Sequence, residues 1–180
     1  MASTTPLLLI GLYVVATAAA AQVPSGIDTR KVGEQEIVSI IKLPGSRAAV
    51  FDAMTQCTHL LQWMQPAPMK MVACSTTPRA GGTLTYVFEA PQGRRLEVRG
   101  RYEKVESPHT IRYRESYDFS PLQFDVQGAF EEAGGATIFT QTLHYRSREE
   151  RDTDFPNVAG SQPGVYANLA KYLARPTVTK

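Results

Sequence analysis

The feature that most constrains the fold is a long stretch, residues 70–145, in which apolar and polar side chains alternate. Alternation with a period of two is typical of antiparallel strands that have one face in the core and one in solvent. Turns rich in Gly and Pro divide the stretch into six such segments. The predicted strands are residues 70–75, 83–90, 95–105, 110–117, 122–130 and 136–145.

The residues before this stretch predict one more strand and two short helices. Residues 35–43 are apolar and rich in β-branched side chains, which is typical of a strand. Ser46 then occupies the position of a helix N-cap, and a helix is expected over residues 48–54. A second short helix is expected over residues 58–64, before a pair of prolines.

The C-terminal part predicts a single helix. Residues 146–162 are polar and irregular, whereas residues 165–173 place Val165, Leu169 and Leu173 on one helical face. The order of strand, two short helices, six strands and one helix predicts an α+β domain. Its sheet is expected to be antiparallel and seven-stranded.

The N-terminal segment differs from everything that follows it. Residues 6–21 carry no charge and end in small residues that fit an A-x-A pattern, which is the anatomy of a secretory signal peptide. We expect cleavage near Ala21 and export to a periplasmic or secreted location; the alternative is an uncleaved N-terminal membrane anchor. After cleavage we expect no stable membrane span. The predicted organisation is a signal peptide at 1–21, a linker at 22–34, the domain at 35–175 and a tail at 176–180.

Two cysteines, Cys57 and Cys74, leave two interpretations open. In an exported protein an even pair can form a disulfide, which would stabilise the fold by about 3 kcal/mol. They can equally be two buried thiols that pack as small apolar side chains. Without histidines at matching spacing they do not make a zinc site.

Composition and charge narrow the classes of partner. The chain is 43% hydrophobic and 20% charged, which fits one globular domain with a sizeable core. A net charge of +2 gives no reason to expect a nucleic-acid partner. Arg94, Arg95, Arg99 and Arg101 do gather in one region, either as a solvated face or as an interaction surface.

The predicted order of elements implies a cavity. The apolar face of a large antiparallel sheet needs covering, and one helix of about three turns covers only part of it. A strongly twisted sheet then curls around the helix and leaves a space suited to a small hydrophobic ligand. The alternative is that the same aromatic residues fill a dry core. The residues expected to line or border the interior are Trp63, Tyr86, Phe88, Tyr102, Tyr113, Phe124 and Tyr166.

Two titratable residues are weak candidates for catalysis. Glu115 is in phase with Ile111 and Tyr113, so the pattern points its carboxylate toward the apolar face, where it would anchor a ligand or act as an acid–base group. Alternatively, it lies near the strand end and reaches water. His144 is a candidate base only if its face is inward, and the opposite phase, with Phe139 and Leu143 inside, leaves it exposed.

The sequence carries no motif for a cofactor or metal. It lacks a nucleophile elbow, a phosphate-binding glycine loop and a zinc-binding H-E-x-x-H, so we expect neither cofactor nor metal. Asp152 and Asp154, expected in a loop, form a poor cation site without further ligands.

Several motifs taken in order resemble those of one family. Residues 50–54 (VFDAM) followed by Trp63 resemble the opening of SRPBCC proteins. Residues 81–86 (GGTLTY), 100–105 (GRYEKV) and 135–137 (GAT) resemble the subgroup named after the activator of heat-shock-protein-90 ATPase. The similarity extends over residues 37–173, nearly all of the expected mature chain.

The resemblance implies the helix-grip fold shared with START lipid-transfer domains and polyketide cyclases. It does not imply one activity, because members bind lipids, polyketides or hormones and some are cyclases or hydrolases. The chaperone-activating role belongs to cytosolic members and does not suit an exported chain. We therefore expect a binder of a small hydrophobic molecule more than an enzyme. The alternatives are a cyclase or hydrolase that uses Glu115, with a contribution from His144, and a protein-interaction domain that uses the strands around Arg95 and Arg99.

Overall fold

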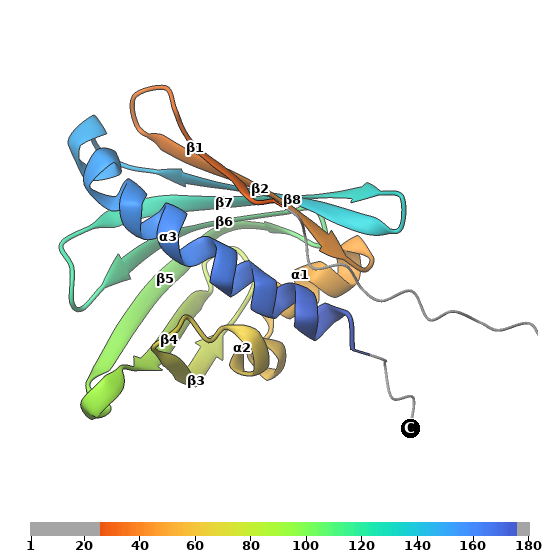
Figure 1. The fold of residues 1–180 in the computed structure, drawn as a ribbon, viewed down its shortest axis with the longest axis horizontal. Coiled ribbons are helices and arrows are strands. Elements are labelled where there is room, and N and C mark those ends of the chain that lie inside the picture. Colours follow the sequence, from red (N-terminus) through yellow and green to blue (C-terminus); the bar gives the residue numbers. More distant parts are fainter. Residues whose placement is uncertain (1–25, 176–180) are drawn as a thin grey trace, which may run out of the picture.

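The computed structural model describes residues 26–175, which form one eight-stranded antiparallel sheet and three α-helices. The sheet curls around the last helix, as Figure 1 shows. Its strand order is β1-β2-β8-β7-β6-β5-β4-β3, so from β3 to β8 each strand pairs with the next in sequence. The strands are β1 (Asp28–Val32), β2 (Glu36–Pro44), β3 (Lys70–Thr76), β4 (Thr83–Glu89), β5 (Arg95–Glu106), β6 (Thr110–Tyr117), β7 (Gln123–Ala133) and β8 (Ala136–His144).

The α+β helix-grip architecture is confirmed, but the sheet has eight strands and not seven. The additional strand, β1, lies inside the segment 22–34 that the sequence predicted as a linker. Its residues, DTRKV, are too polar to show an apolar alternation. They pair with β2 as an edge strand, where backbone hydrogen bonding needs no buried side chain. The predicted signal peptide, residues 1–21, lies outside the described residues, as does the tail at 176–180.

The two short helices form where the sequence predicts them. Helix α1 spans Arg47–Thr55, and the Ser46 hydroxyl accepts a hydrogen bond from the Ala49 amide as an N-cap. Helix α2 spans Cys57–Trp63 and buries Leu60 and Trp63. The Trp63 indole donates to the carbonyl of Ala53, which fixes α2 against α1. A disulfide between Cys57 and Cys74 joins α2 to β3, so of the two interpretations of these cysteines the disulfide is correct.

The last helix is much longer than predicted. Helix α3 spans Arg148–Leu173, so most of the segment expected to be irregular is helical. The Ser147 hydroxyl caps it by accepting from the Glu150 amide. Pro156 and Pro163 lie within α3, and each removes one backbone hydrogen-bond donor. Prolines usually interrupt a helix, so the sequence pattern favoured an irregular segment here.

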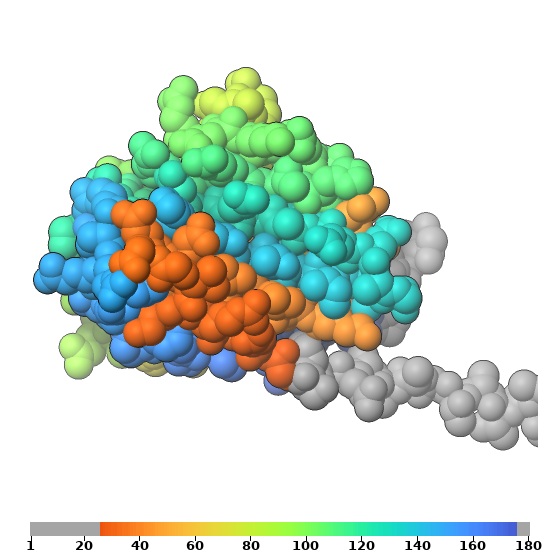
Figure 2. Space-filling view, turned by 90° about the horizontal axis from the view of Figure 1, so that it is seen from above, coloured from red at the N-terminus to blue at the C-terminus, as the bar shows by residue number. Residues whose placement is uncertain are grey.

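Tertiary contacts hold the N-terminal and middle parts of α3 against the sheet. The Gln162 side chain donates to Gln141 of β8 over 2.6 Å, and its amide oxygen accepts from Ser39 of β2. The buried Arg151 guanidinium donates to the Gly33 carbonyl over 3.1 Å. In Figure 2, which views the molecule from above, the orange β1 lies beside the blue N-terminal part of this helix. Contacts with the sheet thus offset the two lost backbone bonds.

Candidate functional site

A cavity of about 710 Å³ lies between the concave face of the sheet and α3. Its walls come from the facing side of strands β4 to β8, from α3, and from the segment around and after α2. The last turns of α3, after Tyr166, pack against the core instead, with Leu169 and Ala170 buried. The single helix therefore fills only part of the concave face, and the remaining space is the cavity.

Most of the residues predicted to line the interior do so. Those in the cavity wall are Trp63, Tyr86, Phe88, Tyr113, Glu115, Phe124 and Tyr166. Tyr102 is the exception among the predicted set. Its side chain is buried on the same face, but its hydroxyl hydrogen-bonds to Thr76 of β3 over 3.0 Å and its ring packs edge-on against Tyr113. Tyr102 is thus a core residue that supports the wall, because Tyr113, its register partner, provides the exposed surface.

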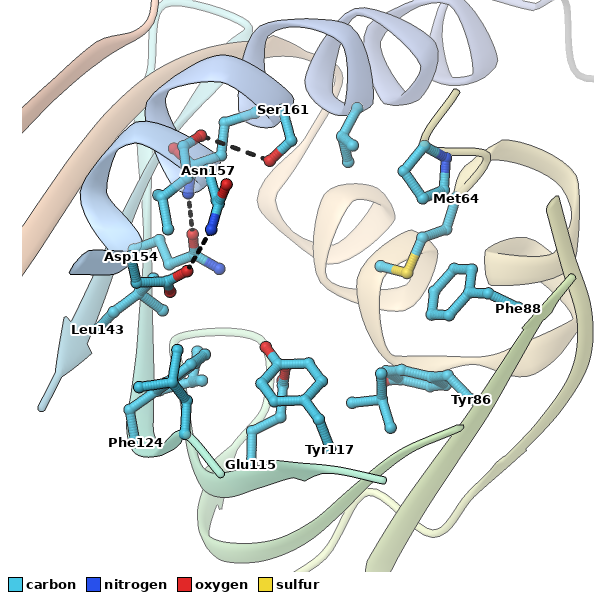
Figure 3. A pocket seen from close by; sticks show the side chains of 18 of the residues that line it. Met64, Tyr86, Phe88, Glu115, Tyr117, Phe124, Leu143, Asp154, Asn157 and Ser161 are labelled. Atoms are coloured by element: carbon cyan, nitrogen blue, oxygen red, sulfur yellow. Dashed lines mark hydrogen bonds between the residues drawn. The ribbon is translucent and has the colours of Figure 1, made fainter. Parts of the chain in front are cut away.

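One end of the cavity is apolar and adaptable. It is lined by Met54 of α1 and by Met64 and Met69, which lie at the two ends of the connection between α2 and β3. Phe88 and Leu96 complete this end of the wall. In Figure 3, Met64, Tyr86 and Phe88 face the open space from this end. Methionine side chains are flexible and polarisable, so such a wall adapts to ligands of different shape. The sequence pattern did not single out Met64 and Met69, because they lie in the connection between α2 and β3, where periodicity gives no phase.

The other end of the cavity carries Glu115 of β6. The alternation of β6 places Ile111, Tyr113, Glu115 and Tyr117 on the same face, and all four line the cavity. The Tyr117 hydroxyl donates to Glu115 Oε1 over 2.5 Å. Burial disfavours the charged form and raises the pKa of Glu115 to about 7, and the negative charge of Asp154 acts in the same direction. Glu115 is therefore present in both protonation states near neutral pH.

Asp154 of α3 is a second carboxylate in the cavity wall, and the sequence analysis missed it. It was expected in a loop, but it lies in the helix and borders the cavity with Asn157 and Ser161. It accepts from the Tyr145 hydroxyl over 2.7 Å and from the Asn157 amide over 3.3 Å. A signal was available, because Ser147 followed three residues later by Glu150 is the pattern of a helix start.

Buried tyrosines surround the two carboxylates. Burial is the main reason why the pKa values of Tyr113, Tyr117, Tyr145 and Tyr166 are raised above that of a free tyrosine. Their hydroxyls therefore stay protonated and act as hydrogen-bond donors throughout the physiological pH range.

The remaining sequence candidates lie away from the cavity. His144 is about half exposed on the opposite face of β8, with Nδ1 at 3.5 Å from Glu36 Oε1, so it is not a base for this cavity. Arg95 and Arg99 are exposed on β5, and Arg99 forms an ion pair with Glu97. Over residues 26–175, no group of three or more His, Cys, Asp or Glu side chains is placed to hold a metal ion. Within the same residues, no helix is both long and apolar enough to cross a membrane.

The fold is shared with several solved structures. A crystal structure of a protein from Rhodobacter sphaeroides is 23% identical, has a TM-score of 0.79, and the match covers 82% of this chain and 97% of that one. A crystal structure from Nitrosomonas europaea is 15% identical with a TM-score of 0.71, covering 77% of this chain and 94% of that one. At these identities the likeness shows the fold alone.

A third solved structure covers a longer protein. DynU16, described as a protein in the dynemicin biosynthetic locus, is 16% identical with a TM-score of 0.61. The match covers 78% of this chain but only 48% of DynU16. No curated protein matches the sequence.

Residues 44–174 match the family model for activator of Hsp90 ATPase homolog 1-like proteins. This span begins at the end of β2 and runs through α3, so it contains both short helices and every cavity-lining residue. The family agrees with the resemblance found in the short motifs and with the helix-grip fold. The chain belongs to the activator of Hsp90 ATPase homolog 1-like family, within the SRPBCC type of domain.

Proposed function

We propose that this protein binds a small, largely hydrophobic molecule in the cavity between the sheet and α3, as a carrier or sensor and not as a catalyst. The observation that carries the proposal is the cavity itself. Its volume of about 710 Å³ falls within the range of about 300–1,000 Å³ that is usual for ligand sites. Its wall combines aromatic and methionine side chains with a few polar groups at one end, which is the usual composition of such sites.

We also propose that the protein works outside the cytosol, after removal of residues 1–21. The uncharged segment and its A-x-A ending support this. The Cys57–Cys74 disulfide supports it as well, because disulfides persist mainly in oxidising compartments. Cell fractionation and N-terminal sequencing of the mature protein test this part. An intact N-terminus on protein from the cytosolic fraction would overturn it.

Binding is tested with the neutral dye Nile red and with organic extraction of the purified protein. We expect the dye's fluorescence to rise on binding and extraction to release a co-purified small molecule. Val165 lines the cavity from α3, so Val165→Phe should fill part of the space and weaken dye binding. Val72→Phe is the matched control, because Val72 is 43% exposed on β3. Equal dye binding by the two variants would count against the cavity as the site.

A second candidate function is acid–base catalysis by Glu115. The specific observation in its favour is a pKa raised to about 7, which suits a group that both takes up and releases protons at neutral pH. The enzyme would be of the cyclase or hydrolase type seen elsewhere in the SRPBCC superfamily. With a candidate substrate in hand, Glu115→Gln should then abolish turnover and retain binding, whereas equal turnover would remove the idea.

A further inference from the structure

The charged side chains of the cavity wall are all acidic. Glu115 reaches the cavity from β6 and Asp154 reaches it from α3, and among the described residues that line the cavity none is Lys, Arg or His. Neither carboxylate forms an ion pair with any residue between 26 and 175. An apolar cavity with two carboxylates at one end and no basic group has a site for positive charge that the protein itself leaves unfilled.

The two carboxylates are held in place by neutral donors. Tyr117 donates to Glu115 Oε1, while Tyr145 and Asn157 donate to different oxygens of Asp154. Figure 3 shows Glu115 and Tyr117 rising from β6 toward the space that Asp154, Asn157 and Ser161 border from the side of α3. These hydrogen bonds orient the carboxylates and leave acceptor capacity on both, since each ionised carboxylate has about four lone-pair sites.

Aromatic rings enclose the same end of the cavity. The rings of Tyr117 and Phe124 line it, with 5.8 Å between their centroids, and Tyr145, outside the wall, packs against Phe124 with 5.0 Å between centroids. A cation that sits close to such rings gains a favourable interaction with their faces, in addition to its attraction to the carboxylates. An anion gains nothing comparable and is repelled by both carboxylates.

We infer that the ligand bound at the site proposed above is an amphipathic organic cation, with an ammonium group between Glu115 and Asp154 and an apolar body toward Met54, Met64 and Phe88. This inference rests on the proposed binding function and adds the chemical class of the ligand. An ammonium donates three hydrogen bonds, so it can engage both carboxylates at once. A fatty acid with an apolar body of the same length would place a third carboxylate beside those of Glu115 and Asp154. No cation in the cavity wall would then balance the three negative charges.

The test uses three probes that share one tail and differ in the head group: decylamine, decanol and decanoic acid. Each competes with Nile red at pH 8, where decylamine is protonated and decanoic acid is ionised. The order expected is decylamine first, then decanol, then decanoic acid. A charge-assisted hydrogen bond makes decylamine about tenfold tighter than decanol.

Substitutions assign the preference to the two carboxylates. Glu115→Gln and Asp154→Asn keep the side-chain size and remove the charge, so each should weaken decylamine about tenfold and change decanol by less than about twofold. Glu132→Gln, at the exposed end of β7 next to the hairpin turn, is the matched control and should change neither affinity. Thermal unfolding of each variant verifies that the domain stays folded.

The outcomes separate the class of ligand from the binding function. Nile red binding together with equal affinities for decylamine and decanol would overturn the inference and leave the proposed function standing. Tighter binding of decanoic acid would do the same. Failure of the wild-type protein to bind Nile red or any of the three probes would overturn both.

Discussion

The hydroxyl of Tyr117 donates a hydrogen bond to the carboxylate of Glu115, two residues earlier on the same strand, with 2.5 Å between the oxygens. Residues two apart on a strand lie on the same face, so strand geometry alone brings the pair together inside the cavity. The pair belongs to the polar end of a cavity wall that is mostly apolar, and its chemistry depends on which of the two groups holds the proton. Burial holds the tyrosine protonated, so the carboxyl group is the one that titrates.

The stability of the domain should depend on pH through Glu115. The pKa of this carboxyl is about 7 in the folded protein and near 4.5 in the unfolded chain, so between these values the folded protein binds a proton that the unfolded chain has released. The free energy of unfolding should therefore fall as the pH rises from about 4.5 to about 7, by up to about 3 kcal/mol. The loss should persist above pH 7.

Urea unfolding at several pH values checks this dependence. Glu115→Gln removes the titrating group, so its unfolding free energy should vary less across this pH window and should exceed that of the wild type at pH 8. The charged and titratable groups that face Glu115 are Asp154 and the tyrosines, and the tyrosines stay protonated throughout the window. Glu132→Gln should leave the pH dependence unchanged. A Glu115→Gln profile parallel to that of the wild type would contradict the assignment.

Tyr117→Phe should raise the pKa of Glu115 further. The hydrogen bond from Tyr117 stabilises the charged carboxylate and so lowers its pKa, against the larger effect of burial. Carbon-13 NMR of the glutamate carboxyl, followed as a function of pH, measures the shift directly. Tyr172→Phe is a suitable control, because the Tyr172 hydroxyl hydrogen-bonds to His59 and lies outside the cavity wall. An unchanged or lowered midpoint in Tyr117→Phe would show that the hydrogen bond has no such role.

Reduction of the Cys57–Cys74 disulfide should destabilise the domain by about 3 kcal/mol, because the closed loop restricts the unfolded chain. Unfolding measured with and without dithiothreitol gives the difference. In a Cys57→Ser, Cys74→Ser double variant the reductant should have no effect. Sensitivity of that variant to reductant would mean that the effect does not come from the disulfide.

Two glycine substitutions should have opposite effects on stability. A Cβ atom at Gly128 would lie 2.9 Å from both Ile111 and Phe139, so Gly128→Ala should cost about 1–3 kcal/mol. Gly160 lies in α3 with no atom within 4 Å of such a Cβ, so Gly160→Ala should stabilise by about 1 kcal/mol. Urea unfolding of both variants measures the two changes. A stabilised Gly128→Ala would mean that the sheet relaxes more easily than the contacts suggest.

Sequence patterns sufficed for the elements whose burial follows a simple period. The central strands and the two short helices have bounds within a few residues of those predicted, because apolar residues mark their faces and Gly or Pro marks their ends. The same alternation indicated an inward Glu115, with exposure near the strand end as the alternative, and the structure selects the inward position. For His144 it left two phases open, and the structure selects the exposed one. For these residues, local pattern and tertiary structure agree.

The errors occurred where tertiary contacts outweigh local preference. β1 is polar along its whole length and exists because β2 offers it an edge. The first half of α3 contains Pro156 and many polar residues, and contacts such as that of Arg151 with the Gly33 carbonyl stabilise it. Asp154 was missed for this reason, because its place in the wall depends on that half being helical. Tyr102 was assigned to the wall because period alone cannot tell which of two neighbouring aromatic residues covers the other.

The edge strand β1 has a consequence for where the functional unit begins. The Thr29 hydroxyl of β1 donates to Gln162, and Lys31 forms an ion pair of 3.0 Å with Asp152. These two contacts hold β1 against the part of α3 that carries Asp154. A shorter chain that starts at residue 35 would keep every cavity-lining side chain. It would lose the contacts of β1 that hold this part of α3 in place. It would also expose the unpaired backbone N–H and C=O groups of β2, and such an edge can pair with a strand of another molecule. The minimal unit for ligand studies therefore extends upstream of the family match, to include residue 28.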